Sequence, residues 1–422
     1  METVRLDREI FQTTAPNGVK VLSERVPSVR SAAVGIWVRT ASAHEARAKM
    51  GVSHLLEHMV FKGTERRSAQ EIALALESRG GSLDAYTSRD TTAFQARVLD
   101  ADLPRALDVL TDLVRNPVLR EADLELERNV VLEEINMVED APDDLVFDLA
   151  SEALWPAHAY GYSILGTRES VGGLSTADLK GLHRAAYLPG NCVIAAAGNL
   201  THEELLAEVE RQGWFASGAG EGEQPPVAAP APPAVRGGER RHSKDSAQTH
   251  IVLATDTVSY ADHRKYPLLV LANVFGGGMS SRLFQRIREE LGLAYAIYAF
   301  TSFYRQVGVA GVYVGTQPKT AERAVAAIRE EYAKLAREGL TGDALAEAKQ
   351  QTQGQLMLSL ESPAARMYRL AGFPVYGEPY QSLDAVIATV NALREDEVAS
   401  VAREFFDPDR QRIVWLGPGD RA

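Results

Sequence analysis

The segment Gly51-Val-Ser-His54-Leu-Leu-Glu57-His58-Met-Val-Phe61 combines apolar residues at helical spacing with two histidines four positions apart. We expect a helix here, with Ser53 as the candidate N-cap. At 3.6 residues per turn, His54 and His58 lie one above the other, so both imidazoles can reach one metal ion. The apolar neighbours indicate burial, where unpaired His and Glu side chains would be costly. The pattern therefore predicts a metal site rather than a solvated helix with incidental histidines.

A catalytic zinc site needs one more protein ligand, because zinc takes three protein donors there and leaves its fourth position to water. Cysteine does not supply it, since the chain has a single cysteine, Cys192, in an apolar run typical of a buried strand. A second expected helix carries Glu127 and Glu134, which are seven residues apart and share a helix face two turns apart. Carboxylate is an acceptable zinc ligand, and two histidines with one glutamate form a catalytic set.

Glu57 is the candidate base of this site. It immediately precedes His58, so its carboxylate projects beside the ligand face. Zinc lowers the pKa of a coordinated water to about 7, and a carboxylate can then accept its proton. This is the chemistry of metal-assisted amide hydrolysis.

The two halves of the chain share one pattern, which predicts an internal repeat. Each half has an early β-patterned run, a helix ending in Val-Phe-x-Gly, further strands, long amphipathic helices and a final strand after a proline. We therefore expect an α+β fold of two homologous domains. Aligning the Val-Phe-x-Gly segments places Leu268, Leu271 and Ala272 opposite the three metal-site residues of the first helix, so the second half keeps the helix without the chemistry. The paired segments are strands at 31–39 and 249–255, motifs at 60–63 and 274–277, strands at 92–99 and 307–314, helices at 101–139 and 319–360, and final strands after Pro189 and Pro408.

A stretch rich in Pro, Gly and Ala separates the halves. It includes Gln-Pro-Pro-Val-Ala-Ala-Pro-Ala-Pro-Pro, a composition typical of an extended linker. We predict a zinc-binding domain at 1–218, a linker at 219–242 and a homologous domain without metal at 243–422.

Net charge and the distribution of apolar residues limit which partners and which cellular compartment we expect. The formal net charge of -12 disfavours nucleic acid and anionic lipid as partners. No window approaches the roughly 18 uncharged apolar residues of a membrane span, and the N-terminus lacks the pattern of a secretory signal. We expect a cytoplasmic protein that binds neither membrane nor nucleic acid.

Four segments together resemble the zinc peptidases of the pitrilysin or insulinase type, whose metal motif is the inverted His-x-x-Glu-His, and specifically the branch similar to mitochondrial processing peptidase. The segments are His54-Leu-Leu-Glu-His-Met-Val-Phe-Lys-Gly-Thr64, Gly80-Gly-Ser-Leu-Asp-Ala-Tyr-Thr-Ser-Arg-Asp-Thr-Thr92, Glu127-Arg-Asn-Val-Val-Leu-Glu-Glu134, and Gly276-Gly-Gly-Met-Ser-Ser-Arg-Leu-Phe-Gln-Arg-Ile-Arg-Glu-Glu-Leu-Gly-Leu-Ala-Tyr295.

The resemblance implies a role for each matching residue. His54, His58 and Glu134 are expected to bind one Zn²⁺ per chain, with Glu57 as the base and Glu127 orienting the site from behind. Arg288 and Tyr295 are expected to contact substrate and steady the carbonyl under attack. Without the resemblance, they read as an exposed helix arginine and a core tyrosine.

The resemblance also implies how substrate binds. The segment 83–88, with Asp84 and Ala85, resembles an edge strand to which an extended peptide adds as a further strand. The family often has Asn at the position of Asp84, and the extra carboxylate is expected to alter substrate preference in a direction that the sequence leaves open. The chain would form one half of a clamshell chamber that a second copy completes as a homodimer.

Three functions follow for testing. The first is a zinc endopeptidase that cleaves unfolded or extended peptides inside a dimeric chamber. The second is a structural or assembly homologue that has lost catalysis, against which the intact motif argues. The third is one subunit of a heterodimer in which one chain supplies zinc and the other supplies the Arg and Tyr pair. This chain holds both sets, which favours a self-sufficient enzyme.

Overall fold

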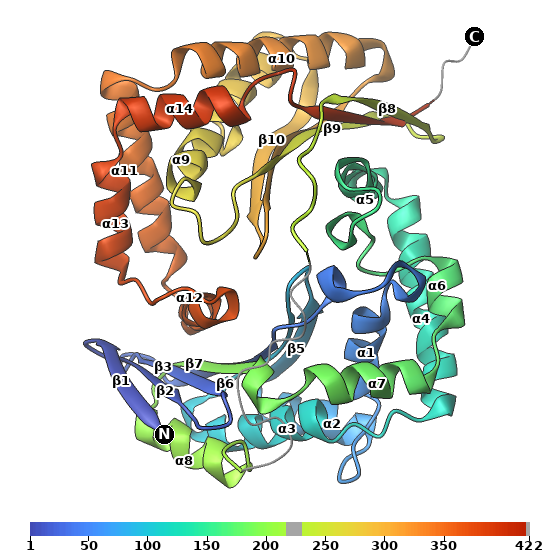
Figure 1. The fold of residues 1–422 in the computed structure, drawn as a ribbon, viewed down its shortest axis with the longest axis vertical. Coiled ribbons are helices and arrows are strands. Elements are labelled where there is room, and N and C mark those ends of the chain that lie inside the picture. Colours follow the sequence, from blue (N-terminus) through green and yellow to red (C-terminus); the bar gives the residue numbers. More distant parts are fainter. Residues whose placement is uncertain (217–229, 419–422) are drawn as a thin grey trace. The chain divides into compact units, whose positions relative to one another are not determined.

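Two β-sheets, each covered by helices, organise the protein in the computed structural model, which describes residues 1–216 and 230–418 (Figure 1). The described residues form two compact units. The first unit comprises residues 1–135, 163–216 and 359–380, and the second comprises 136–162, 230–358 and 381–418.

The first unit contains a seven-stranded sheet in the order β1-β2-β3-β7-β4-β6-β5. Strands β3 and β7 run parallel, while β4 runs antiparallel to both β6 and β7. Because helices cover both faces, inner strands such as β7 are apolar without alternation. Cys192 on β7 is buried, as the sequence predicts, and burial raises the pKa of its thiol to about 12. The strands are β1 (Glu2–Asp7), β2 (Ile10–Thr14), β3 (Lys20–Arg25), β4 (Ser31–Val38), β5 (Ser82–Thr87), β6 (Thr92–Leu99) and β7 (Cys192–Gly198).

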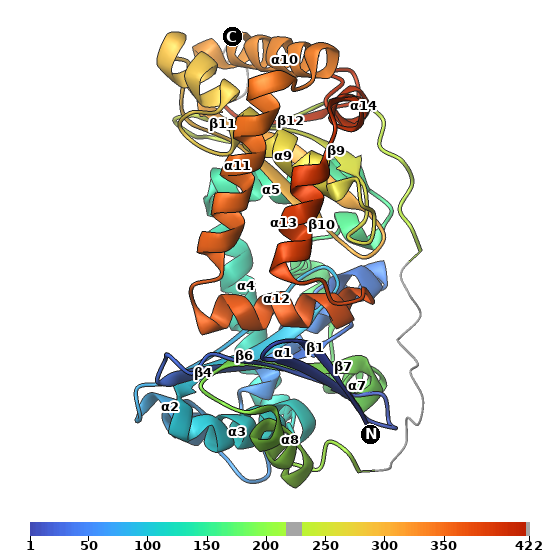
Figure 2. The same cartoon turned by 90° about the vertical axis from the view of Figure 1, so that its left-hand side faces the viewer.

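Alternate residues of this sheet build two separate apolar layers. On one face, Val34 and Phe94 pack with Leu55 of α1 and with helices α3 and α8. On the other face, Ala33 and Trp37 pack with helix α12 alone among the described helices (Figure 2). The metal motif on α1 therefore lies in the layer to which several helices contribute. The helices of this unit are α1 (Val52–Val60), α2 (Ala69–Glu77), α3 (Leu103–Arg115), α4 (Glu121–Asp140, in this unit up to residue 135), α6 (Arg168–Gly173), α7 (Thr176–Ala186), α8 (His202–Arg211) and α12 (Pro363–Tyr376).

The second unit contains a five-stranded sheet in the order β10-β11-β9-β12-β8, in which β12 and β8 run parallel. Helices α9, α10 and α14 cover one face around Leu253, Val312 and Trp415. The strands are β8 (Gly238–Ser243), β9 (Thr249–Thr257), β10 (Ala294–Phe303), β11 (Gly308–Thr316) and β12 (Arg412–Gly417). The helices are α5 (Pro142–Leu154), α9 (Lys265–Gly276), α10 (Ala321–Glu338), α11 (Gly342–Ser359), α13 (Leu383–Ala392) and α14 (Glu395–Phe405).

The strand orders confirm the internal repeat. The run β3-β7-β4-β6-β5 matches β8-β12-β9-β11-β10 strand for strand, with the parallel pair at the same place. Helix α9 follows β9 as α1 follows β4, and Leu268, Leu271 and Ala272 on α9 are buried. The fold is therefore α+β with two homologous domains, as the sequence predicts.

The two compact units are not contiguous in sequence, unlike the domains expected at 1–218 and 243–422. Each unit includes one helical segment from the other half of the chain. Helix α12, from the second half of the sequence, places Met367 and Leu370 on the first sheet. Helix α5, from the first half, places Phe147 against Tyr313 of β11, with ring centroids 5.6 Å apart. Each sheet thus receives its second apolar cover from the other half of the chain.

Two sequence expectations need correction. Residues 219–229 of the linker expected at 219–242 lie outside the described residues, and strand β8 (Gly238–Ser243) begins within the far end of that linker. This edge strand is mostly exposed, so its polar sequence Gly-Glu-Arg-Arg-His-Ser shows no strand pattern. The helical stretches expected at 101–139 and 319–360 are each two helices, α3 with α4 and α10 with α11, separated at 116–120 and at 339–341.

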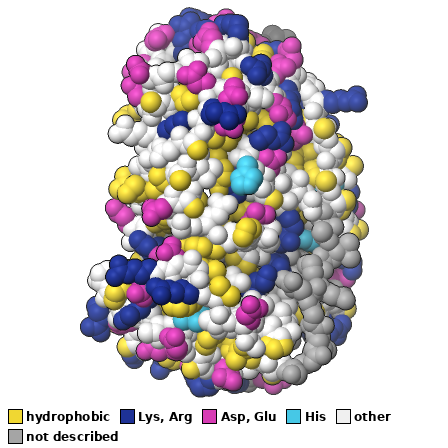
Figure 3. Space-filling model, turned by 60° about the vertical axis from the view of Figure 1, so that its left-hand side comes forward, with side chains coloured by type: hydrophobic (Ala, Val, Ile, Leu, Met, Phe, Trp, Pro, Cys, Tyr) yellow, Lys and Arg dark blue, Asp and Glu magenta, His cyan; other side chains and the backbone are white. Residues whose placement is uncertain are grey.

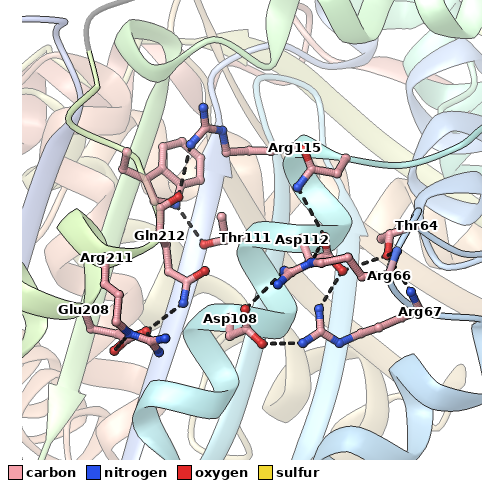
Figure 4. Close-up of polar contacts among 12 residues, drawn as sticks. Thr64, Arg66, Arg67, Asp108, Thr111, Asp112, Arg115, Glu208, Arg211 and Gln212 are labelled. Carbon is pink, nitrogen blue, oxygen red and sulfur yellow. Dashed lines mark hydrogen bonds and ion pairs between the residues drawn. The ribbon is translucent and has the colours of Figure 1, made fainter.

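An ionic cluster ties the loop after the metal helix to α3 (Figure 4). The buried Asp112 accepts hydrogen bonds from Thr64 Oγ1 at 2.7 Å, Arg66 Nε at 3.0 Å and Arg67 Nη1 at 2.6 Å. Asp108, one turn earlier on α3, pairs with both arginines. These charge-assisted hydrogen bonds hold the loop, and through it the C-terminal end of α1, against helix α3.

Charged side chains of both signs are mixed on the face drawn in Figure 3, where Asp and Glu lie among Lys and Arg. This matches a diffuse acidic surface better than a single acidic field on that face. Among the described residues, no helix combines the length and apolar character needed to cross a membrane.

Candidate metal centre

The N-terminus of α1 is held by a side chain from outside the helix. The carboxylate of Glu45 accepts hydrogen bonds from the backbone N–H groups of Gly51 and Ser53, each at 2.8 Å. The N-cap is Gly51, at φ 87°, rather than the expected Ser53. A Cβ at Gly51 would lie 2.5 Å from the carbonyl oxygen of Leu165, so glycine is required there. Glu45 satisfies the free N–H groups that a capping serine would otherwise take.

Helices α1 and α4 bring the three predicted metal ligands together. His54 Nε2 lies 3.6 Å from one Glu134 carboxylate oxygen, and His58 Nε2 lies 3.6 Å from the other. One donor atom from each residue lies within 4.8 Å of the others. Among the described residues, this is the one group of three or more His, Cys, Asp or Glu side chains with such spacing.

Glu127 contacts His58 on the ring nitrogen that faces away from Glu134. Its Oε2 is 3.2 Å from His58 Nδ1, and its Oε1 is 2.6 Å from Lys62 Nζ. The Glu127 side chain is only 7% exposed, so Lys62 supplies the charge that a buried carboxylate needs. This contact favours the tautomer in which His58 Nδ1 donates to Glu127, which leaves the lone pair of Nε2 for a metal ion held together with Glu134.

Glu57 is oriented by the adjacent sheet. Thr87, the last residue of β5, donates a hydrogen bond of 2.6 Å from Oγ1 to Glu57 Oε2. Glu57 is 9% exposed, and this burial raises the pKa of its carboxyl, while the hydrogen bond from Thr87 lowers it in part. One carboxylate oxygen is thus fixed by Thr87, which leaves the other oxygen for proton transfer.

The donor set fits zinc. Zinc–nitrogen and zinc–oxygen bonds of about 2.0–2.1 Å in a tetrahedral site separate neighbouring donors by about 3.3 to 3.4 Å, close to the 3.6 Å between each histidine Nε2 and a Glu134 oxygen. Burial, and then the charge of nearby His58, lower the pKa of His54 to about 4, so its imidazole is neutral at pH 7 as a metal ligand requires. His54 Nδ1 is buried without a hydrogen-bond partner among the described residues. The chain offers two imidazoles and one carboxylate, which is a catalytic zinc set.

Strand β5 lies at the edge of the first sheet, beyond β6. Ala85 and Leu83 face the layer that contains α1, while Tyr86 packs on the opposite layer with α12. Asp84 is exposed and lies opposite Gln95 in the register with β6. The outer edge of β5 is unpaired within the described sheet, as strand addition requires.

Arg288 and Tyr295 contact each other in the second unit. Arg288 lies on the π-helical segment Phe284–Glu290, and its Nη1 donates a 2.9 Å hydrogen bond to the carbonyl oxygen of Tyr295. The guanidinium carbon is 4.4 Å from the centroid of the Tyr295 ring, and Tyr295 as a residue is 78% exposed. Tyr295 is thus an exposed tyrosine held by arginine, in place of the core tyrosine that its sequence context favours.

Sequence reasoning missed three residues that support the centre, namely Glu45, Lys62 and Thr87. Lys62 had a local signal, because it follows His58 by four residues and so lies near the same helix face. Thr87 has the same strand parity as Ala85, which places it toward α1. For Glu45 no periodicity indicates that its carboxylate returns to the start of a helix six residues later.

Comparison with known proteins supports this architecture. Residues 20–168 match the family described as insulinase (peptidase family M16), and residues 173–352 match the peptidase M16 inactive domain. The uncharacterized zinc protease YmxG of Bacillus subtilis is 39% identical over 95% of this chain and 96% of its own length. An uncharacterized zinc protease of Streptomyces coelicolor is 38% identical over 97% of this chain and 90% of its own length.

Two solved structures share the fold at low sequence identity. A protein described as the peptidase M16 inactive domain from Pseudomonas fluorescens has a TM-score of 0.88 and 22% identity, covering 98% of this chain and 99% of its own. A protease from Helicobacter pylori has a TM-score of 0.90 and 21% identity, covering 97% of this chain and 99% of its own.

The duplicated α+β fold and the His-x-x-Glu-His centre define the class of inverted-motif zinc-protease-like proteins. Because family matches cover most of the chain and relatives above 30% identity span nearly all of it, the chain belongs to peptidase family M16, the insulinase family.

Proposed function

We propose that this protein is a zinc endopeptidase that binds one Zn²⁺ per chain and cleaves unfolded or extended peptides. The observation that carries the proposal is the donor set of His54, His58 and Glu134 with the carboxylate of Glu57 held beside it by Thr87. A structural homologue without catalysis would have no need to keep a buried base next to a complete ligand set, because buried carboxylates cost stability.

Each residue has a defined task in amide hydrolysis. Bound zinc would supply Lewis acidity for polarising the scissile carbonyl and for activating water. Glu57 accepts the proton of the attacking water on its free carboxylate oxygen and returns it to the leaving amine. Glu127 and Lys62 hold His58 in one tautomer, and β5 aligns the substrate backbone beside Glu57.

Substrate selection is the first test of this function. We expect the purified protein to contain stoichiometric zinc and to cleave a library of unstructured peptides, because strand addition needs an extended backbone. A stably folded globular protein at the same concentration should stay intact. Mass spectrometry of products and metal analysis of the protein check both points. A protein without zinc that cleaves no peptide would favour the structural or assembly alternative, and rapid cleavage of the folded protein would exclude an enclosed chamber.

We further infer that the active form is a homodimer in which Arg288 and Tyr295 of one subunit complete the zinc site of the other. The chain carries both the zinc set and this pair, so it needs no different partner. The exposed ring of Tyr295, held by Arg288, is presented for a contact beyond its own surroundings. Closed two-fold pairing is the commonest oligomer and would generate two equivalent sites.

Complementation between inactive variants tests the shared site. In a mixed dimer of Glu57→Gln and Tyr295→Phe subunits, one site receives both defects and the other site receives none. Activity should therefore return to about half that of a wild-type dimer per mixed dimer. The measurement is peptidase activity after subunit exchange, with exchange verified by differently tagged subunits.

A matched mixture separates sharing from other effects. Glu57→Gln mixed with His58→Ala places one defect in each zinc domain, so both sites of the mixed dimer stay inactive. Recovery in the first mixture but not in this control supports the shared site. Full activity from a strict monomer, or no recovery after verified exchange, would refute it and leave the zinc assignment intact.

A further inference from the structure

A hollow of about 300 Å³ lies beside the edge strand, on the face of the first sheet opposite the metal centre. Ser82 and Asp84 of β5 line it, together with Gln95 of β6 and with Met367 and Tyr368 of α12. All of these residues belong to the first unit. A peptide strand added to the free edge of β5 would therefore pass directly along this hollow.

The alternation of β5 determines which peptide side chains reach the hollow. Thr87, Ala85 and Leu83 share the face of α1, whereas Tyr86, Asp84 and Ser82 share the face of α12. Directly opposed residues in a sheet point to the same face in both parallel and antiparallel pairs. Whichever way the peptide runs, the residue opposite Asp84 therefore points toward α12.

Asp84 gives this position a negative charge that lacks a partner. Its side chain is exposed and makes no hydrogen bond or ion pair with any residue that the structure describes. The pKa of Tyr368 is raised by burial first, then by Tyr86 and by the Asp84 carboxylate, in agreement with a position of that charge near the Tyr368 hydroxyl. The Tyr368 hydroxyl itself donates a hydrogen bond to Gln95 Oε1, so it does not neutralise Asp84.

Two tyrosines lie on the same face of the sheet as Asp84, namely Tyr86 two positions along β5 and Tyr368 of α12, which lines the hollow. The rings of Tyr86 and Tyr368 have centroids 6.2 Å apart, and Trp37 Nε1 donates a 3.2 Å hydrogen bond to the Tyr86 hydroxyl. A basic side chain in the hollow would pair with Asp84, and a cation held over a tyrosine ring gains a cation–π contact as well. An acidic or bulky apolar side chain gains neither interaction there.

Arg97 is the one cationic residue that lines the hollow, and it lies on β6 rather than on the edge. A side chain opposite Asp84 would have its Cβ about 5 Å from the Asp84 Cβ. The same side chain would be two strand spacings, or about 10 Å, from β6. Attraction to Asp84 therefore exceeds repulsion from Arg97 for a basic side chain on the added strand.

We propose that this hollow is a subsite for one basic side chain, lysine or arginine, of the bound peptide. The inference rests on the proposed function, in which an extended peptide adds to β5. Asp84 lies three positions before Thr87, which contacts Glu57, so the subsite lies about 10 Å along the strand from the base. The preference should therefore belong to a single peptide position within a few residues of the cleaved bond.

Binding to an uncleaving enzyme tests the subsite independently of turnover. The background is Glu57→Gln holoprotein, and the probes are fluorescein-labelled unstructured peptides in which a single lysine is moved along a neutral sequence. At one position, lysine should bind about three- to tenfold tighter than glutamine by fluorescence anisotropy. Adding Asp84→Asn should reduce that ratio to near one, and Asp84→Lys should favour glutamate at the same position.

A charge-matched control distinguishes the local effect from the acidic balance of the chain. Glu77 is exposed on α2, which packs in the layer of α1 on the sheet face opposite the hollow, so Glu77→Gln removes the same formal charge and should leave the lysine preference unchanged. An equal preference in the Asp84→Asn and Glu77→Gln proteins would overturn the subsite, as would a lysine advantage spread evenly over all positions. In parallel, absence of cleavage by the wild-type enzyme would refute the proposed peptidase function, whereas the binding ratios alone decide the subsite.

Discussion

Replacing Glu57 with glutamine is expected to lower kcat/KM for peptide cleavage by about 10³-fold while the protein keeps its zinc. The loss follows from removal of the base, since positioned acid–base catalysis contributes about 10²- to 10⁴-fold. A 10³-fold loss corresponds to about 4 kcal/mol of transition-state stabilisation. Glutamine preserves the size of the side chain and still accepts the hydrogen bond from Thr87 through its carbonyl oxygen.

The measurement combines steady-state kinetics with metal analysis of the same preparation. Glu133→Gln is the matched control. Glu133 is exposed on α4 beside the predicted ligand Glu134, and this substitution replaces a carboxylate with an amide just as Glu57→Gln does. It should leave both activity and zinc content unchanged. Loss of zinc in the Glu57→Gln protein would make Glu57 a ligand, and retained activity would remove it as the base.

Replacing Glu134 with alanine is expected to deplete the protein of zinc, and His58→Ala should have the same effect. A carboxylate that bridges toward both Nε2 atoms at 3.6 Å cannot be replaced by a methyl group. The loss of affinity should exceed the roughly 10- to 100-fold that changes behind the ligands cost. Zinc content after dialysis against a weak chelator reports this directly.

Thermal unfolding gives a second readout that does not depend on activity. A ligand that binds only the folded state stabilises it by about 4 kcal/mol at a concentration 1,000 times its Kd. Zinc should therefore raise the melting temperature of the stripped wild-type protein and leave that of Glu134→Ala unchanged. Glu133→Ala should respond like wild type.

Glu127→Gln distinguishes the two glutamates of α4. Glu127 contacts His58 Nδ1 and Lys62, so its replacement should weaken zinc binding less than the loss of Glu134 does. A larger loss of zinc from Glu127→Gln than from Glu134→Ala would exchange their roles.

The local geometry of the site could be predicted because it depends on helix periodicity alone. Residues four apart share a helix face, so the ligand pair of α1 was set by spacing, and the same holds for two glutamates seven apart on α4. Which glutamate meets the Nε2 atoms depends on how α4 packs against α1. Spacing left that choice open, the family resemblance favoured Glu134, and the structure places Glu134 beside both imidazoles.

The repeat was likewise readable because covered strands carry long apolar runs that stand out in sequence. The polar edge strand β8 was missed because an exposed edge imposes no apolar pattern. The helix cap was misassigned for a related reason. A serine near a helix start is a local signal, but the carboxylate of Glu45 satisfies the same N–H groups from outside the helix.

By itself the sequence determined the covered strands and the amphipathic helices, their duplication and the set of residues able to bind zinc, because each is carried by a residue pattern that can be read along the chain. Only the tertiary structure shows that α12 covers the first sheet and α5 the second. The apolar stripe of an amphipathic helix predicts that the helix is packed against something, but it does not indicate which sheet. The tertiary structure also decided the support of the centre by Thr87 and the unpaired charge of Asp84 beside Tyr368. These relations join strands and helices that are distant in sequence, and only packing around a common core brings them within contact distance.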